Sequence, residues 1–218
     1  MKKFLLCFLL LLLPILLLGC SKSVTLEDSI SEITKIYFTA NTVGAKGNIS
    51  VGQREENYKI DGNHTKNCDF SLISIKFDEL LPNNQIIVDI SINETISQVE
   101  LDLNPANHYY MADLGFLLKA DDKVKISYND FVFDFENASE KFVIDYQEAL
   151  SLAKEELKDK LKGYYDGKQF NGEGYLKILT EQGGDDENLF WVFTIVGKNG
   201  LKSNVVLSVD DGRVIVSD

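Results

Sequence analysis

Hydrophobic and polar residues alternate along most of the chain between residues 33 and 137. The alternation is clearest at 86–92, 99–103, 124–128 and 131–135, and further strand candidates lie at 36–39, 49–51, 58–60, 72–77 and 109–112. An apolar residue at every second position gives a strand one core-facing side, which is typical of half-buried antiparallel strands. Turn residues such as Asp61-Gly62-Asn63 separate the runs. Seven to nine short strands predict an antiparallel β-sandwich of immunoglobulin-like architecture over residues 33–137.

After residue 137 the period of the pattern changes from that of a strand to that of a helix. Asp145 is a predicted N-cap, Glu148 stands three residues later, and Gly163 follows the last apolar position, so we expect one helix between them. Its apolar stripe consists of Tyr146, Ala149, Leu150, Ala153, Leu157 and Leu161. Strands are expected at 175–180, 189–196, 201–209 and 213–216. The fold class is therefore mainly β with an α+β part: over 138–218, a small domain of one helix packed on a three- to four-stranded antiparallel sheet.

The first 20 residues form a separate signal. Lys2 and Lys3 precede the almost wholly apolar run 4–18, and the sequence then reads Leu17-Leu18-Gly19-Cys20. This arrangement is that of a secretory signal peptide, and its end resembles the lipobox of bacterial lipoproteins. The resemblance implies cleavage after Gly19 and attachment of a lipid to Cys20. An uncleaved membrane helix is disfavoured because the run is shorter than the roughly 20 residues that span a bilayer.

We therefore expect a protein that is held in the cell membrane by acylated Cys20 and faces outside the cytoplasm, on the periplasmic or extracellular side. Residues 1–19 would be the signal peptide and 20–32 the lipidated N-terminus and tether. The chain carries a net charge of −12, which becomes −14 once the two signal-peptide lysines are removed. Such acidity argues against binding nucleic acid and against lying flat on anionic lipid.

The C-terminal part resembles PepSY-type domains. The resemblance is carried by the helix start at 145–153, the aromatic strand at 190–193 and the final hairpin at 207–214. It implies an extracytoplasmic, non-catalytic module that binds or restrains other proteins, peptidases among them, and it supplies no active-site residues.

Residues that could carry chemistry are few and scattered. The two histidines, His64 and His108, lie in polar turn-like segments without metal-ligand spacing, and no nucleophile elbow or phosphate loop is present. The acidic runs at 55–56, 121–122, 185–187 and 210–211 are predicted to be solvated turns, with a weak calcium site as the alternative at 185–188. Cys68 is expected to be half-buried and inert. We expect no catalytic residue, no resident metal, no cofactor and no enzymatic activity.

Four aromatic residues are candidates for contact with a partner: Tyr109, Tyr110, Trp191 and Phe193. Adjacent tyrosines on a strand point to opposite faces, so one of the first pair should face outward. Trp191 is expected either in the core or on an open sheet face, with the core favoured. The function predicted from the sequence is a non-catalytic lipoprotein that binds an envelope protein. The alternative is a lipoprotein that binds cell wall or another glycan.

Overall fold

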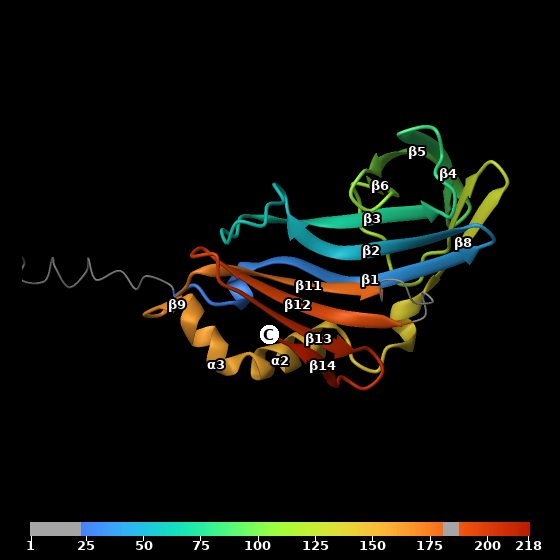
Figure 1. The fold of residues 1–218 in the computed structure, drawn as a ribbon. Helices are drawn as coiled ribbons and strands as arrows, with labels where there is room; N and C mark the ends of the chain where they lie inside the picture. The colour runs from blue at the N-terminus through green and yellow to red at the C-terminus, as the bar shows by residue number, and fades with distance from the viewer. Residues whose placement is uncertain (1–22, 181–187) are drawn as a thin grey trace, which may run out of the picture.

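A computed structural model describes residues 23–180 and 188–218 (Figure 1). In these residues most strands belong to one continuous twelve-stranded sheet in the order β14-β13-β12-β11-β1-β2-β3-β6-β5-β4-β7-β8. A second pairing, between β1 and β8, closes eight of these strands into an antiparallel barrel. The barrel strands are β1 (Ile30–Thr42), β2 (Ala45–Glu55), β3 (Asn67–Phe77), β4 (Gln85–Ile92), β5 (Thr95–Asn104), β6 (Tyr109–Asp113), β7 (Val124–Tyr128) and β8 (Phe131–Asn137).

Strand β1 is the wall that the two parts of the molecule share. Near its start, Ile30 and Ile33 pair in parallel with β11 (Gly172–Thr180), whereas further along Phe38 and Thr39 pair with β8. The register between β1 and β2 shifts between Thr34 and Ile36, which marks a bulge, and a bulge bends a strand. Beyond it, the neighbours Tyr37 and Phe38 are buried in two different cores, one on each face of β1.

Two glycines in β2 permit the close approaches that the curved sheet requires. A Cβ on Gly47 would meet the ring of Phe135 at 2.9 Å, so the absence of a side chain at Gly47 makes room for this ring, which comes from β8. A Cβ on Gly52 would lie 1.9 Å from the carbonyl oxygen of Ile33, beside the bulge in β1. Glycine within a strand often marks such close backbone contacts.

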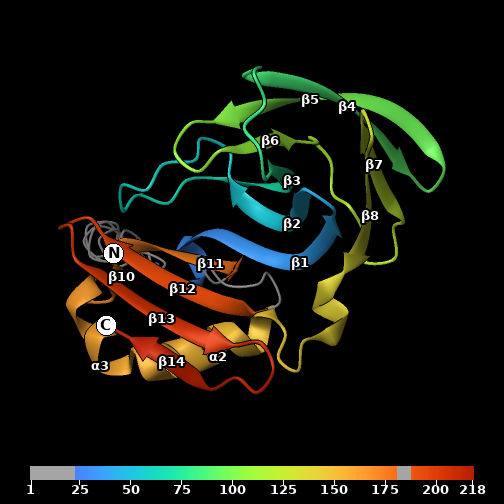
Figure 2. The same cartoon turned by 45° about the vertical axis from the view of Figure 1, so that its right-hand side comes forward.

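The C-terminal sheet continues from β11 through β12 (Leu189–Gly197), β13 (Lys202–Ser208) and β14 (Val214–Ser217), which are mutually antiparallel. Helix α2 (Tyr146–Glu156) lies along one face of this sheet (Figures 1 and 2). Its Ala149 and Ala153 join the core that contains Trp191, Phe193 and Leu207. The remaining short elements are η1 (Glu27–Ser29), η2 (Ala138–Lys141), α3 (Lys158–Leu161), η3 (Lys162–Tyr164), β9 (Tyr165–Asp166) and β10 (Gln169–Phe170).

The predicted fold class, a β-sandwich over 33–137 followed by a separate helix-on-sheet domain over 138–218, is wrong. The N-terminal strands close into a barrel, and the C-terminal sheet is an extension of the barrel wall through the pairing of β1 with β11. Alternating apolar positions are common to sandwiches and barrels, so the pattern could not distinguish them. Closure depends on the pairing of β1 with β8, strands nearly one hundred residues apart in the chain.

Three local expectations also need correction. The long helix ends early at Glu156, and Gly163 lies in the short helix η3 instead of following the end of the first helix. Residues 58–60 form no strand but belong to a loop between β2 and β3. The predicted tether does not extend to Glu32, because Leu26 and Ile30 are buried in the C-terminal core.

Among the described residues, no helix combines the length and the apolar character needed to cross a membrane.

Candidate functional site

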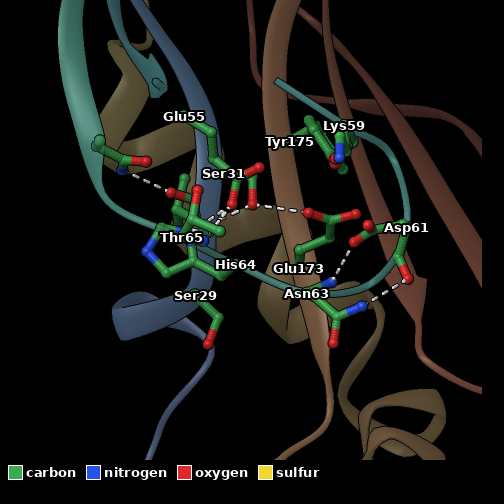
Figure 3. A network of polar contacts seen from close by, with 12 residues as sticks. Ser29, Ser31, Glu55, Lys59, Asp61, Asn63, His64, Thr65, Glu173 and Tyr175 are labelled. Atoms are coloured by element: carbon green, nitrogen blue, oxygen red, sulfur yellow. Dashed lines mark hydrogen bonds and ion pairs between the residues drawn. The ribbon is translucent and has the colours of Figure 1, made fainter. Parts of the chain in front are cut away.

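A network of buried polar side chains lies where β1 separates the barrel from the C-terminal sheet (Figure 3). Ser31 comes from β1, Glu55 from the end of β2, Glu173 from β11, and His64 from the loop 56–66. Ser31 and Glu173 have no solvent-exposed surface, and Glu55 is 1% exposed. We call these four residues the seam network. Carboxylates are seldom fully buried without partners, so the network must supply them with hydrogen bonds.

The hydrogen-bond donors and acceptors of the seam network can be assigned from Glu173 outward. Ser31 Oγ donates to Glu173 Oε2 at 2.9 Å, and the backbone N–H of Gly62 donates to Glu173 Oε1 at 2.6 Å. Because the single hydroxyl hydrogen of Ser31 is donated to Glu173, Ser31 Oγ can only accept a hydrogen bond from His64 Nδ1, which lies 3.3 Å away. Nδ1 therefore carries the hydrogen, and it is also 3.4 Å from Glu55 Oε1. Glu55 Oε1 accepts a further hydrogen bond from the backbone N–H of Thr65.

A second cluster lies beside the network. Lys177 on β11 forms an ion pair with Glu32 at 2.7 Å and donates to the hydroxyl of Tyr58 at 2.6 Å. The rings of Tyr58 and Tyr175 meet edge to face, and the Tyr175 hydroxyl donates to the carbonyl of Lys59 at 3.0 Å. Burial, followed by interactions with Glu32, raises the pKa of Tyr58. Burial, followed by the neighbouring carboxylate of Glu173, raises the pKa of Tyr175, so both phenols stay neutral at physiological pH.

The presence of serine, histidine and glutamate together suggests a hydrolase, but the geometry does not support one. In a catalytic triad the serine and the carboxylate bind different ring nitrogens, so that a proton can pass between them. Here Ser31 and Glu55 share Nδ1 of His64. Ser31 is also fully buried, which leaves a substrate no route to its hydroxyl. Among the described residues, no group of three or more His, Cys, Asp or Glu side chains could hold a metal ion.

The seam network instead fastens the loop 56–66 across the junction of the two parts. Gly62 lies so close to the turn after β12 that a Cβ on it would be 2.7 Å from the backbone nitrogen of Lys198. The sequence interpretation missed this network, because it placed Glu55 in a solvated turn and His64 in a polar loop without partners. A signal was present at Glu173, a carboxylate between two glycines at the start of a predominantly apolar strand.

The face of the C-terminal sheet opposite α2 carries a row of apolar side chains. Strand register places Val192 beside Val206 and Val206 beside Val216, with Leu179 paired to Phe190 on the same face. Leu179 is 47% exposed and Val216 is 53% exposed, while the other three are half-buried. We call these five residues the open sheet face. The loop 56–66 covers the neighbouring part of this face at β11, through the contacts of Tyr58 with Tyr175 and Lys177.

Strand β14 forms one edge of the sheet. In the described part of the chain it pairs with β13 alone, and Val214, Ile215 and Val216 are all exposed. Natural edge strands are usually protected by lysine, proline or a covering element. The sequence Val-Ile-Val-Ser contains no proline and no charge. Its unpaired backbone groups are therefore open to another strand.

The four predicted contact residues are placed very differently. Trp191 is 1% exposed and donates from Nε1 to the carbonyl of Ile144 at 3.2 Å, and Phe193 is fully buried, so both belong to the core beneath α2. Tyr110 is 3% exposed and donates to the carbonyl of Asn83 at 2.5 Å. Tyr110 and Phe193 therefore cannot contact a partner, which corrects that expectation, whereas Trp191 lies in the core, the position favoured for it from the sequence. Their alternate neighbours Phe190 and Val192 face outward instead.

Tyr109 is half-buried and keeps some accessible surface. It lies in a groove of about 390 Å³ between the barrel and the C-terminal sheet, which Tyr37, Lys46 and Lys141 also line. The ammonium group of Lys76 lies 5.6 Å from the centre of the Tyr109 ring.

The cysteines and the acidic loop are the remaining candidates from the sequence. Cys20 and the acidic residues 185–187 lie outside the described residues. Cys68 is an exposed free thiol, not the half-buried residue expected.

Comparison of the chain with protein-family models, with curated proteins and with solved structures finds no match.

Proposed function

We propose that this protein is a bacterial lipoprotein, anchored outside the cytoplasm through acylated Cys20, that binds an envelope protein without catalysing a reaction. The sequence 17–20 supports the anchor. The observation that carries the binding function is the unprotected edge strand β14 beside the open sheet face.

The partner we propose is an extended segment of another polypeptide, which adds to the sheet as a strand next to β14. In this mode, backbone hydrogen bonds supply affinity and apolar side chains at alternate positions supply specificity. Val216 and its cross-strand neighbour Val206 would receive such side chains. The PepSY resemblance of 145–153 and 207–214 makes an envelope peptidase one class of partner.

The experiment places a photo-crosslinking residue at Ile215 in the lipidated, membrane-bound protein. A matched pair of variants reports on the edge: Val216→Lys on β14 and Val132→Lys on β8, where Val132 is 45% exposed on the barrel. A lysine on an edge strand opposes the addition of another strand. We expect a specific crosslinked protein whose yield falls at least about tenfold in Val216→Lys, as expected for roughly 1.4 kcal/mol, and is unchanged in Val132→Lys. Equal yields in both variants would refute the proposed binding edge.

A second candidate function is glycan binding in the groove beside Tyr109. Its support is the exposed part of one aromatic ring in a groove that also contains Asn41 and Asn48. Binding of the protein to purified cell-wall material that is lost in Tyr109→Ala would favour this function over the first.

A further inference from the structure

The chain enters the fold at one end of the molecule, with almost no tether. Val24 N–H donates to the Gln169 side chain at 3.0 Å, and the N–H of Phe170 donates to the carbonyl of Val24 at 3.0 Å. These two bonds tie the first described residues to the β9–β10 hairpin. Leu26, two residues further, is 1% exposed. The hairpin end of the molecule, at the left of Figure 1, is therefore where the chain begins its folded course.

Only a short piece of chain separates this end from the proposed lipid. Three residue steps lead from Cys20 to Ser23, and such a segment spans at most about 10 Å. If Cys20 carries the anchor, as the proposed function states, this end lies against the lipid headgroups. A tether that extended to residue 32 would have allowed the body to stand away from them.

Three segments form this end of the molecule: α3 with η3, the β9–β10 hairpin, and the turn between β12 and β13. The N–H of Lys198 donates to the carbonyl of Asn171, and the N–H of Asn171 donates to the carbonyl of Tyr164. Tyr164 also reaches β13, since its hydroxyl donates to Ser203 Oγ at 2.9 Å. A Cβ on Gly163 would lie 3.4 Å from Leu201. The three segments are thus one contiguous surface.

Positive charge gathers on this surface, although the protein as a whole is acidic. Residues 158–170 and 198–202 contain six lysines and two aspartates, Asp159 and Asp166. Lys158 and Lys162 are paired with Glu155 and Asp159. The other four lysines, Lys160, Lys168, Lys198 and Lys202, are exposed and have no ion pair within the described residues. We call these four the basic end.

Two exposed apolar side chains accompany the basic end. Tyr165 is 39% exposed on the hairpin, and Leu201 is 43% exposed on the turn. Tyrosine is enriched at the membrane–water interface, where its ring is buried and its hydroxyl stays hydrated. Lysines near an anionic bilayer surface are each attracted to it by about 1 kcal/mol, so four of them reinforce a lipid anchor.

We propose that the basic end docks on anionic phospholipid headgroups of the membrane that holds the anchor. This inference rests on the proposed lipid attachment at Cys20. It replaces the expectation that the acidic body does not lie against anionic lipid, because four exposed lysines gather at the end that the anchor brings to the membrane. Docking there fixes the orientation of the protein and keeps the barrel, at the opposite end, away from the bilayer.

The test uses the full lipidated protein in vesicles of phosphatidylcholine, with or without phosphatidylglycerol. In a Cys68→Ser background, a fluorescent label is placed at Asn199→Cys on the basic end or at Val43→Cys, where Val43 is 95% exposed in the β1–β2 turn. We expect the label at position 199 to be shielded from an aqueous quencher on phosphatidylglycerol vesicles only. The label at position 43 should be quenched equally on both kinds of vesicle.

A matched pair of charge reversals provides the control. Lys168→Glu with Lys198→Glu alters the basic end, and Lys119→Glu with Lys123→Glu makes the same change in charge on the barrel. Each lysine lost should lower the equilibrium constant for docking roughly fivefold, so the first pair should lower it by at least about 25-fold and reduce shielding strongly, whereas the second pair should leave shielding unchanged.

The outcomes separate the two proposals. All variants should float with the vesicles, because the anchor is intact. If the protein floats but the label at position 199 is quenched equally on both kinds of vesicle, the docking proposal is refuted while the proposed lipid attachment is retained. Failure of the unaltered lipidated preparation to float would instead refute the proposed lipid attachment, and docking with it.

Discussion

Replacing Glu173 with alanine tests the role of the seam network. The carboxylate accepts hydrogen bonds from Gly62 N–H at 2.6 Å and from Ser31 Oγ at 2.9 Å, in a site with no solvent exposure. Its removal leaves two buried donors without an acceptor. An unsatisfied buried donor costs about 1–3 kcal/mol, so we expect Glu173→Ala to lower the free energy of unfolding by about 2–6 kcal/mol.

A smaller change distinguishes hydrogen bonding from packing. Glu173→Gln keeps the shape of the side chain and one acceptor oxygen, so only one of the two donors loses its partner. We therefore expect the free energy of unfolding to fall by about half as much as in Glu173→Ala. Glu100→Ala, an exposed glutamate on β5, is the matched control and should change stability by less than about 0.5 kcal/mol.

Urea unfolding measures the stability, and amide hydrogen exchange at Gly62 reports on the loop 56–66 itself. We expect exchange at Gly62 to accelerate in Glu173→Ala. If Glu173→Ala proved as stable as Glu100→Ala, with unchanged exchange at Gly62, the seam network would not hold this loop.

Three further predictions concern stability. Because burial and Glu173 raise the pKa of Tyr175, the folded protein retains a proton that the unfolded chain loses above about pH 10. The contribution of Tyr175 to the free energy of unfolding is fully present below that pH and should fall by up to about 1.4 kcal/mol per pH unit above it. Urea unfolding at several pH values should show a smaller slope in Tyr175→Phe, and the same slope in both proteins would contradict this prediction. Gly52→Ala should lower the urea midpoint by the equivalent of about 1–3 kcal/mol, since its Cβ would lie 1.9 Å from the Ile33 carbonyl oxygen; an unchanged midpoint would rule out this clash. Asp145→Ala should cost about 1 kcal/mol in thermal unfolding, because the carboxylate caps the N–H groups of Gln147 and Glu148, whereas Asp145→Asn should retain most of it; equal losses would argue against capping.

Local patterns in the sequence predicted individual elements well, because neighbouring residues decide them. Asp145 is the N-cap of α2, as its position before an apolar stripe indicated. Strands β4, β7 and β8 lie where the alternation is clearest.

Tertiary arrangement was not accessible from the same patterns. The bulge in β1 directs its two halves to different partners, and no local signal identifies β8 and β11 as those partners. The seam network depends on that arrangement, since Ser31, Glu55 and Glu173 come from β1, β2 and β11, and β11 lies beside the other two strands only through its pairing with β1. Phe193 and Tyr110 were misplaced for a simpler reason: the sequence shows which side chains share a face of a strand, but the position of α2 and the closure of the barrel decide which face is covered.

The chemical state of residue 20 decides whether the protein is held in the membrane as proposed. Mass spectrometry of the N-terminal peptide, from protein isolated from bacterial membranes, measures that state. We predict a chain that begins at Cys20 and carries a diacylglycerol on its sulfur. A chain that retains residues 1–19 and has a free thiol at Cys20 would contradict the account.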